Sequence, residues 1–280
     1  MNQQNFFCIR GFMKSGTNWI CRILKSHPEV DCIGEFHWES FYRALDQNIA
    51  RIAPKRRETL DHAVRPELEQ MVRRSLTKLS TKPALWIGDR TPTTIDPVVI
   101  SDAVHFVAVR DFRDVIVSRM FHLYSHPRVT GVFDKYPKMK TRLEKFEANP
   151  WYFRDNPNEL VDNEEIVRTS AREWRAFLHS DRKTIEANPK LEILKVKYES
   201  LHQDFDGQVK QMFDLLGLSV PDLPDSVRPG HAEEKPNSLN RKGEVGDWRN
   251  YLNDQTKRWI NDELLDELME LGYVQSIQWG

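Results

Sequence analysis

The feature of this sequence that most limits its fold is an apolar run that leads through a glycine-containing loop directly into a helical pattern. Residues 6–11 read FFCIRG, residues 12–16 read FMKSG, and residues 17–26 carry apolar side chains at helical spacing. A buried strand followed within a few residues by a helix is typical of α/β proteins with a parallel sheet. The unpaired N–H groups at such a helix N-terminus attract an anion. The opening residues therefore predict an anion-binding loop on the first strand of a parallel sheet.

The rest of the chain continues the alternation of strand and helix patterns. Periodicity predicts strands at residues 6–11, 84–88, 103–110 and 191–198. It predicts helices at residues 17–26, 56–79, 114–124, 163–186, 205–216 and 255–271. The first and third strands are nearly continuous in apolar residues, as expected where helices cover both faces of a sheet. We therefore expect a P-loop-like, three-layer α/β/α fold with a central, mainly parallel sheet.

Size and composition favour a single soluble globular domain over residues 1–280, which are 39% hydrophobic and 30% charged. The 41 basic and 42 acidic side chains nearly cancel, so no global field attracts nucleic acid or anionic lipid, and a small-molecule partner is expected. The sequence has no basic leader and no run of eighteen apolar residues, which predicts a cytoplasmic protein that does not span a membrane. The three cysteines (Cys8, Cys21 and Cys32) lack metal-ligand spacing and are expected to be apolar packing residues in a reducing compartment. A homodimer is the default expectation.

The first loop departs from the pattern of a nucleoside-triphosphate loop. Gly11 and Gly16 keep the required interval, but Thr17 and Asn18 follow where a lysine and a hydroxyl residue are expected, and the lysine is Lys14, inside the loop. Gly16 permits close backbone approach to an anion, and Lys14 adds a mobile positive charge.

Two neighbouring side chains extend this prediction. Ser15 adds a hydroxyl donor, and Trp19 lies in the first turn of the helix, where an indole can stack on a nucleobase or join the core. A lysine-containing turn that merely caps a helix is the alternative interpretation of the loop.

Two further segments carry groups suited to a phosphate. Arg110 ends a buried strand and Ser118 follows eight residues later in the next helix, at the sheet edge where open α/β folds bind ligands. The run Arg241, Lys242 and Gly243 is suited to closing on an anion. A structural ion pair of Arg110 with a nearby aspartate, and a solvated basic turn at the second segment, are the alternatives.

Taken together, these segments resemble the sulfotransferases that use 3′-phosphoadenosine-5′-phosphosulfate (PAPS). The stretch MKSGTNW is similar to the family's 5′ loop, RKGEVGDW to its C-terminal motif, Arg110 and Ser118 to its strand-end pair, and ILKVKYESL to its strand and tyrosine. The resemblance implies roles for three groups of residues. The 5′ phosphosulfate would be held by Lys14, Ser15, Gly16, Thr17 and Asn18. The 3′ phosphate would be held by Arg110, Ser118, Arg241, Lys242 and Gly243. The adenine would be flanked by Trp19 and Tyr198.

The position of Lys14 has a chemical explanation under this resemblance. A sulfuryl group carries less charge than a γ-phosphoryl group, so no magnesium ion is required and no metal site is expected. Lys14 would meet the bridging oxygen as it gains charge in the transition state. The histidines at 122 and 126 lack partners at metal-ligand spacing.

The general base is the point at which the chain departs from the cytosolic members of the family, which take a histidine from a Lys-Thr-His run. Here Arg90 and Thr91 match the first two positions and Pro92 occupies the third, so Arg90 is expected to support the sulfonate only. The segment VDCIGEFHWESF resembles the Glu-x-His segment of glycan sulfotransferases, which makes Glu35 the first candidate and His37 the second. A buried glutamate would have a raised pKa suited to this role. Asp89 is the third candidate and Glu39 the fourth.

The acceptor is expected to be a hydroxyl of a small molecule or sugar. Its contacts are predicted from residues 36–43 and from an acceptor-side lid at 126–158, while residues 220–250 are predicted to close over the cofactor. The aromatic residues of that lid are Phe133, Tyr136, Trp151, Tyr152 and Phe153. A nucleotide kinase and a non-catalytic adenine-nucleotide-binding protein are the alternative functions. The kinase would require ATP, magnesium and a lysine directly after Gly16.

Overall fold

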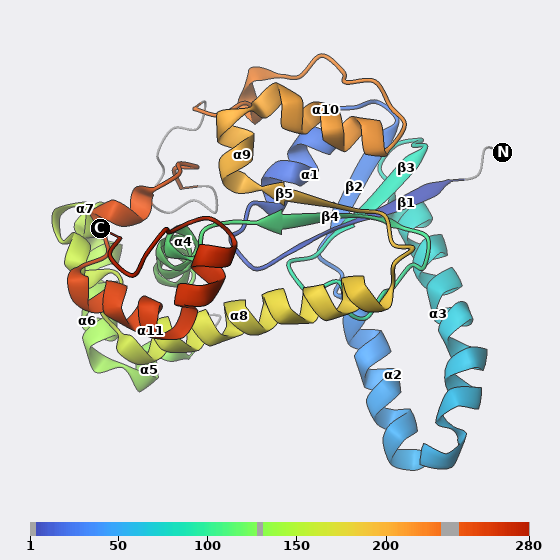
Figure 1. The fold of residues 1–280 in the computed structure, drawn as a ribbon, viewed down its shortest axis with the longest axis horizontal. Coiled ribbons are helices and arrows are strands. Elements are labelled where there is room, and N and C mark those ends of the chain that lie inside the picture. The colour runs from blue at the N-terminus through green and yellow to red at the C-terminus, as the bar shows by residue number, and fades with distance from the viewer. Residues whose placement is uncertain (1–3, 128–130, 231–240, 280) are drawn as a thin grey trace. The chain divides into compact units, whose positions relative to one another are not determined.

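The structure, a computed structural model, describes residues 4–127, 131–230 and 241–279 (Figure 1). The chain forms two compact units. Unit 1 comprises Met1–Val109 and Phe177–Val227, and unit 2 comprises Arg110–Ala176 and Arg228–Gly280. Each unit is described by itself.

Unit 1 contains a five-stranded sheet in the order β2-β3-β1-β4-β5, in which every neighbouring pair is parallel. Its strands are β1 (Asn5–Gly11), β2 (Val30–Gly34), β3 (Trp86–Arg90), β4 (Val104–Val109) and β5 (Ile193–Lys197). The predicted α/β class with a parallel sheet is confirmed. Three of the four predicted strands overlap the observed ones closely, and β3 lies two residues later than predicted.

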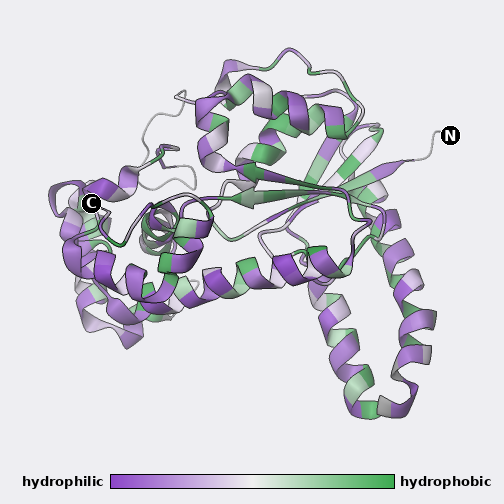
Figure 2. Ribbon diagram, in the orientation of Figure 1, coloured by the Kyte–Doolittle hydropathy of each residue, from purple (hydrophilic) through white to green (hydrophobic). Residues whose placement is uncertain are grey.

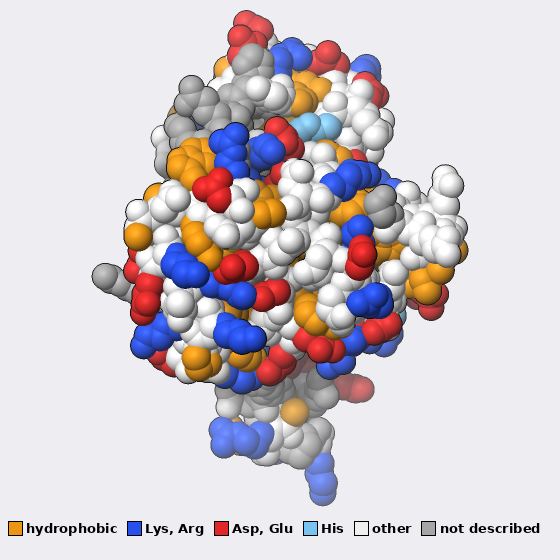
Figure 3. Space-filling model, turned by 90° about the vertical axis from the view of Figure 1, so that its left-hand side faces the viewer, with side chains coloured by type: hydrophobic (Ala, Val, Ile, Leu, Met, Phe, Trp, Pro, Cys, Tyr) orange, Lys and Arg blue, Asp and Glu red, His pale blue; other side chains and the backbone are white. Residues whose placement is uncertain are grey.

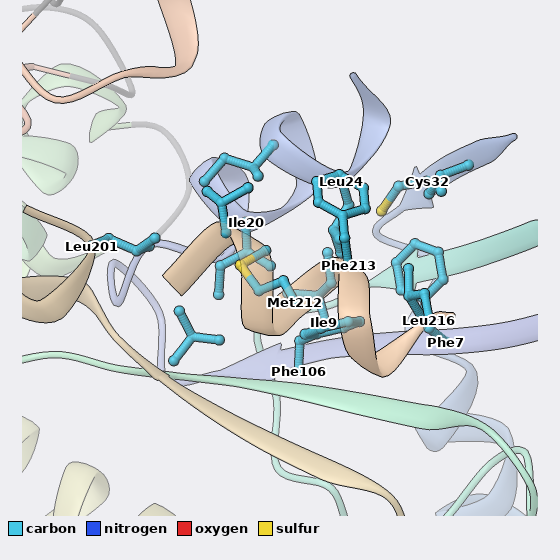
Figure 4. Packing of buried hydrophobic residues seen from close by; sticks show 14 of the residues in the cluster. Phe7, Ile9, Ile20, Leu24, Cys32, Phe106, Leu201, Met212, Phe213 and Leu216 are labelled. Atoms are coloured by element: carbon cyan, nitrogen blue, oxygen red, sulfur yellow. The ribbon is translucent and has the colours of Figure 1, made fainter. Parts of the chain in front are cut away.

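Helices cover both faces of this sheet. The helices of unit 1 are α1 (Thr17–Lys25), α2 (Trp38–Ile52), η1 (Pro54–Arg56), α3 (Arg57–Leu79), α8 (Glu164–Ala187) from Phe177 on, α9 (Tyr198–Gln203), α10 (Phe205–Leu215) and η4 (Asp225–Val227). Alternate side chains of β1 point to opposite faces. Phe7 and Ile9 join a buried cluster with α1, α9 and α10 (Figure 4), whereas Phe6 and Cys8 join a second cluster with α2 and α3. This alternation produces the three layers.

Several elements of unit 1 were not predicted, among them the strand β2 and the helices α2 and α9. The edge strand β2 is short and carries a buried aspartate, Asp31, which interrupts its apolar pattern. Asp31 Oδ2 accepts hydrogen bonds from the Thr81 N–H at 2.7 Å and the Ser80 hydroxyl at 3.0 Å. Although burial alone would raise it, these bonds lower the pKa of Asp31 to about 2. The helix α2 was also not predicted. It begins at Trp38, within the segment 36–43 that was predicted only to contact the acceptor.

Unit 2 is helical. It contains α4 (Phe112–Ser125), α5 (Val132–Lys135), α6 (Pro137–Ala148), α7 (Tyr152–Asp155), η3 (Pro157–Glu159), η5 (Asp247–Asn250), α11 (Asp254–Glu270) and α8 (Glu164–Ala187) as far as Ala176. Figure 2 shows these helices as mixtures of hydrophobic and hydrophilic positions, in contrast to the mainly hydrophobic β4. The six helices predicted from periodicity are confirmed, with ends that agree within two residues.

The predicted lid at 126–158 is largely helical, apart from residues 128–130, which lie outside the described residues. Of the aromatic residues predicted to contact the acceptor, Phe133 and Phe153 are buried beside Tyr124, with ring centroids 5.4 and 4.6 Å from it, whereas Trp151 is exposed. These two rings therefore belong to the core of unit 2, and the acceptor-side lid stays a prediction. Within the predicted closing segment 220–250, residues 231–240 also lie outside the described residues.

Candidate functional site

The loop between β1 and α1 has the backbone expected of an anion-binding turn. The Ser15 N–H donates to the Phe12 carbonyl at 3.1 Å, and Gly16, at a φ of 100°, caps the N-terminus of α1. The Ser15 Oγ is buried and has no hydrogen-bond partner within the described part of the chain. A buried hydroxyl without a partner is costly, so its position in this loop favours a ligand that accepts a hydrogen bond.

Positive φ angles mark two of the predicted catalytic residues. Among the non-glycine residues that the structure describes, these angles occur at Lys14 (68°) and His37 (52°). Left-handed backbone at such residues costs about 1–3 kcal/mol and is found most often at functional sites. The loop that holds Lys14 and the loop that holds His37 are therefore both candidates for a site.

Two aromatic side chains predicted to flank an adenine lie together beside the first loop. Trp19 and Tyr198 have ring centroids 5.1 Å apart, and the Trp19 Nε1–H donates to the Val227 carbonyl at 2.6 Å. A Cβ atom on Gly16 would lie 2.7 Å from Tyr198 Cδ2, so only glycine fits there. The structure thus brings Gly16, Trp19 and Tyr198 together although Tyr198 is far away in sequence.

A buried ion pair joins the carboxyl ends of β1 and β3. Arg10 Nη1 lies 2.7 Å from Asp89 Oδ2, with side chains 3% and 2% exposed, and the Thr91 hydroxyl donates to the same carboxylate at 3.1 Å. Asp89, the third candidate for the base, is therefore engaged in a structural network. Arg10 and Thr91 were not assigned a role from sequence, because their meeting depends on the pairing of β1 with β3.

Arg90 and Glu35, both predicted to be catalytic, form an ion pair. The Arg90 Nη1 donates to Glu35 Oε1 at 2.5 Å. The parallel register places Gly34 opposite Arg90, and a Cβ atom at Gly34 would lie 2.6 Å from the Arg90 carbonyl oxygen. From the sequence we expected Glu35 to be buried, but its side chain is 43% exposed. The expected burial of this carboxylate is therefore wrong.

The next residues along the chain form a second polar pair. His37 is the N-cap of α2, and its Nδ1 lies 3.0 Å from Oε1 of Glu39 in the first turn. Glu39, the fourth candidate for the base, is buried, while half of the His37 side chain is exposed. Glu35, His37 and Glu39 lie within five residues of the sequence, and the structure adds the contact between His37 and Glu39.

Unit 2 holds the second set of predicted ligands. The Arg110 Nη2 donates to the Glu244 carbonyl at 2.9 Å. Arg110 therefore contacts the turn at residues 241–248, which has the sequence RKGEVGDW. Asp114, in the first turn of α4, accepts from the N–H groups of Gly246 at 2.7 Å and Trp248 at 3.0 Å. Burial raises the pKa of Asp114. The sequence signal for the role of Asp114 was an acidic residue in the first turn of a helix, where the helix dipole favours a negative charge.

The basic residues of the same turn are grouped around one carboxylate. Asp247 is buried, pairs with Arg241, and accepts from Lys242 Nζ at 3.2 Å. Burial alone would raise it, but the charge of Arg241 and the hydrogen bonds around it lower the pKa of Asp247. The Arg241 guanidinium also lies 4.1 Å from the ring centre of Phe121 on α4. These contacts fix two cations beside α4, the helix that carries Ser118, which is half-buried.

On the face shown in Figure 3, basic and acidic side chains are interspersed, so neither sign of charge dominates that face. Within residues 4–127, 131–230 and 241–279, no three His, Cys, Asp or Glu side chains are grouped so that they could hold a metal ion. The described helices include none that combines the length and apolar character needed to cross a membrane.

Comparison with known proteins gives a consistent assignment. Among solved structures, the chain is similar to mouse sulfotransferase SULT7A1 complexed with PAP, at 17% identity and a TM-score of 0.50, covering 95% of this chain and 85% of that one. It is also similar to the sulfotransferase domain from the curacin biosynthetic pathway, at 13% identity and a TM-score of 0.54, covering 99% of this chain and 100% of that one. A third similar structure is a sulfotransferase from Alicyclobacillus acidocaldarius, at 16% identity and a TM-score of 0.51, covering 99% of this chain and 98% of that one.

At these identities the three structures support the fold alone. A search of curated proteins gives no match. The profile of the family described as Sulfotransferase domain matches residues 5–271, nearly the whole chain. The chain therefore belongs to the sulfotransferase domain family, whose chemistry is sulfuryl transfer.

Proposed function

We propose that this protein transfers the sulfuryl group of PAPS to a hydroxyl of a small-molecule or sugar acceptor by in-line displacement. The observation that carries the proposal is the loop between β1 and α1. There, the buried Ser15 hydroxyl has no hydrogen-bond partner in the described chain, and it lies beside a left-handed Lys14 at a helix N-terminus. A hydroxyl donor, a cation and a helix dipole together suit a 5′ phosphosulfate.

The remaining nucleotide contacts follow from the groups described above. Thr17 and Asn18 would add donors at the 5′ end, and Trp19 and Tyr198 would contact the adenine. The 3′ phosphate is assigned to Arg110, Ser118, Arg241, Lys242 and Gly243. The planar guanidinium of arginine can donate two parallel hydrogen bonds to two oxygens of a phosphate, so Arg110 and Arg241 are expected to contribute most of that affinity.

Lys14 is assigned the main role in transition-state stabilisation. Bound PAPS supplies an activated sulfuryl group whose leaving oxygen belongs to the 5′ phosphate. Lys14 would stabilise that oxygen as the bond to sulfur breaks, an effect for which a single donor is worth about 3 kcal/mol. Arg90 would stabilise the sulfonate oxygens, and Glu35 or His37 would remove the acceptor proton.

Nucleotide selectivity and transfer test this function separately. Thermal shift should show stabilisation by adenosine 3′,5′-bisphosphate (PAP) and none by ATP with Mg²⁺, and Ser15→Ala should weaken PAP binding. Radiolabelled PAPS incubated with a panel of phenols, alcohols and sugars should label at least one acceptor. Preference for ATP with Mg²⁺ would favour a kinase, and PAP binding without transfer to any hydroxyl would favour a nucleotide-binding protein.

A further inference from the structure

The loop between β2 and α2 contains a histidine–carboxylate pair whose geometry points to a division of labour. The Glu39 side chain is 7% exposed and the His37 side chain is 51% exposed, and their nearest polar atoms lie 3.0 Å apart. The carboxylate is thus on the protein side of the imidazole. The imidazole is accessible to a molecule that approaches from solvent.

The charge of Glu39 decides which ring nitrogen of His37 carries a proton. An ionised carboxylate only accepts hydrogen bonds, so the neutral imidazole must donate from Nδ1 and keep its lone pair on Nε2. Glu39 also interacts electrostatically with the buried Arg10: burial alone would lower the pKa of Arg10, but the negative groups around it, Asp89 and Glu39 among them, raise it.

Glu39 also has an unused hydrogen-bonding position. Its Oε2 is buried and has no hydrogen-bond partner among the described residues, so one oxygen is committed to His37 and the other to no hydrogen bond. A carboxylate retained under these conditions costs folding free energy, and hydrophobic side chains often replace such groups without loss of stability. A role in orienting His37 accounts for that cost.

The backbone supports the same role. His37 has φ and ψ of 52° and 44°, a left-handed conformation that strains a residue with a Cβ atom. His37 adopts this conformation as the N-cap of α2, and its Nδ1 lies 3.0 Å from Oε1 of the first-turn Glu39. The strain is thus associated with one ring orientation.

Glu35 has a competing commitment. Its Oε1 accepts a hydrogen bond from Arg90 at 2.5 Å. Among the described residues, Arg90 is the cation that forms an ion pair with Glu35. Taking up a proton would neutralise Glu35 and break the charge pairing that holds the Arg90 guanidinium beside Gly34. Glu35 is therefore better suited to positioning Arg90.

We propose that His37 Nε2 accepts the proton of the acceptor hydroxyl, that Glu39 is its positioning residue, and that Glu35 positions Arg90. The inference rests on the sulfuryl transfer proposed above. The acceptor O–H bond breaks as its oxygen bonds to sulfur, and the bond from sulfur to the 5′ phosphate oxygen breaks with its electron pair leaving on that phosphate. The proton is left on Nε2, and Glu39 stabilises the resulting imidazolium.

The tautomer of His37 tests the positioning role without any turnover. In protein labelled with ¹⁵N at its nine histidines, the His37 signals are identified by their loss in His37→Gln. Wild type should show the Nδ1–H form at a pH where the ring is neutral. Glu39→Leu should shift the ring toward the Nε2–H form, while Glu39→Gln, whose amide oxygen still accepts, should keep the wild-type form. The same tautomer in wild type and Glu39→Leu would overturn the positioning role.

Steady-state kinetics with PAPS and an acceptor from the panel test the base. His37→Gln should lower kcat by about 100-fold or more, and Glu39→Leu by about tenfold, with little change in the KM for PAPS. Glu39→Gln should recover part of the loss. The exposed Glu67→Leu on α3 is the matched control and should match wild type. Circular dichroism and PAP binding establish that each variant is folded.

Two failures are distinguishable in this experiment. A wild-type protein that binds no PAP and transfers no sulfuryl group contradicts the proposed function itself. A wild type that transfers, together with a His37→Gln variant of undiminished kcat, overturns the inference alone, and a selective loss in Glu35→Gln would then move the base to Glu35.

Discussion

Asp181 provides a test of the electrostatics of unit 1 that does not depend on catalysis. The residue lies on α8, and its Oδ1 accepts from the Ile95 N–H at 2.8 Å. Its Oδ2 is buried and lacks a hydrogen-bond partner among the residues described. Burial raises the pKa of Asp181 to about 7 from an ordinary value of 3.8. The folded protein therefore holds this proton more tightly than the unfolded chain does.

The sign of the effect follows from that difference. Below pH 3.8 both states are protonated, and the site imposes no penalty. Between pH 3.8 and about 7 only the unfolded state ionises, so the free energy of unfolding falls by about 1.4 kcal/mol per pH unit. The complete penalty is about 4 kcal/mol and is reached above pH 7. Asp181 thus contributes stability at acid pH that is lost as the pH rises.

Asp181→Asn removes the titration and keeps an oxygen for the Ile95 N–H. Its advantage in the free energy of unfolding over wild type should grow by about 3 kcal/mol between pH 5 and pH 8, because the penalty accumulates from pH 5 to about 7. Urea denaturation at several pH values measures this difference. Asp254→Asn, at a carboxylate 89% exposed, is the matched control. A stability difference that stays constant from pH 5 to 8 would refute the reasoning.

Three further predictions concern the first strand, loop and helix. Lys14→Ala should keep PAP affinity within about tenfold while kcat falls by about 100-fold, because a single transition-state donor is worth about 3 kcal/mol. Calorimetry of PAP binding with parallel kinetics checks this, and equal losses of affinity and kcat would contradict a role of Lys14 in the transition state. Gly16→Ala should destabilise the protein by about 1–3 kcal/mol and weaken PAP binding in thermal shift, because its methyl group would meet a tyrosine ring at 2.7 Å in a left-handed backbone; wild-type behaviour would argue against that loop conformation. Iodoacetamide should alkylate Cys21, whose pKa is lowered by a hydrogen bond from Cys32, faster than Cys8, whose pKa burial raises to about 11; mass spectrometry of tryptic peptides measures both, and equal rates would contradict the assignment.

The parts of the fold that sequence could predict are those where one physical signal dominates. The strands β1 and β4 are buried on both faces, so their apolar runs are unbroken. Asp31 breaks that signal in β2, because its hydrogen bonds to residues 80 and 81 arise only after folding. For α2 a usable signal was present, since Tyr42, Leu45 and Ile49 are spaced three and four residues apart.

The candidate site residues could be named from the sequence, whereas their contacts with one another could not. The nucleotide-binding candidates occur in local motifs, so each could be named from its own segment. The pairing of Glu35 with Arg90 depends on the register of β2 with β3, and without β2 as a strand nothing placed Gly34 opposite Arg90. The likewise unpredicted helix α2 determines that Glu39 faces His37.

The Asp114 contacts described for unit 2 have a consequence for redesign. Asp114 holds the turn at 246–248 through main-chain N–H groups, which every residue except proline provides. The contacts of Asp114 are therefore independent of the side chain of Val245, whereas Arg249 donates from its own side chain to the Gly246 carbonyl and lies over the Trp248 ring. A library that randomises the exposed Val245, with Asp114, Arg249 and the two glycines at 243 and 246 retained, would vary the surface beside the proposed phosphate-binding residues while preserving the turn.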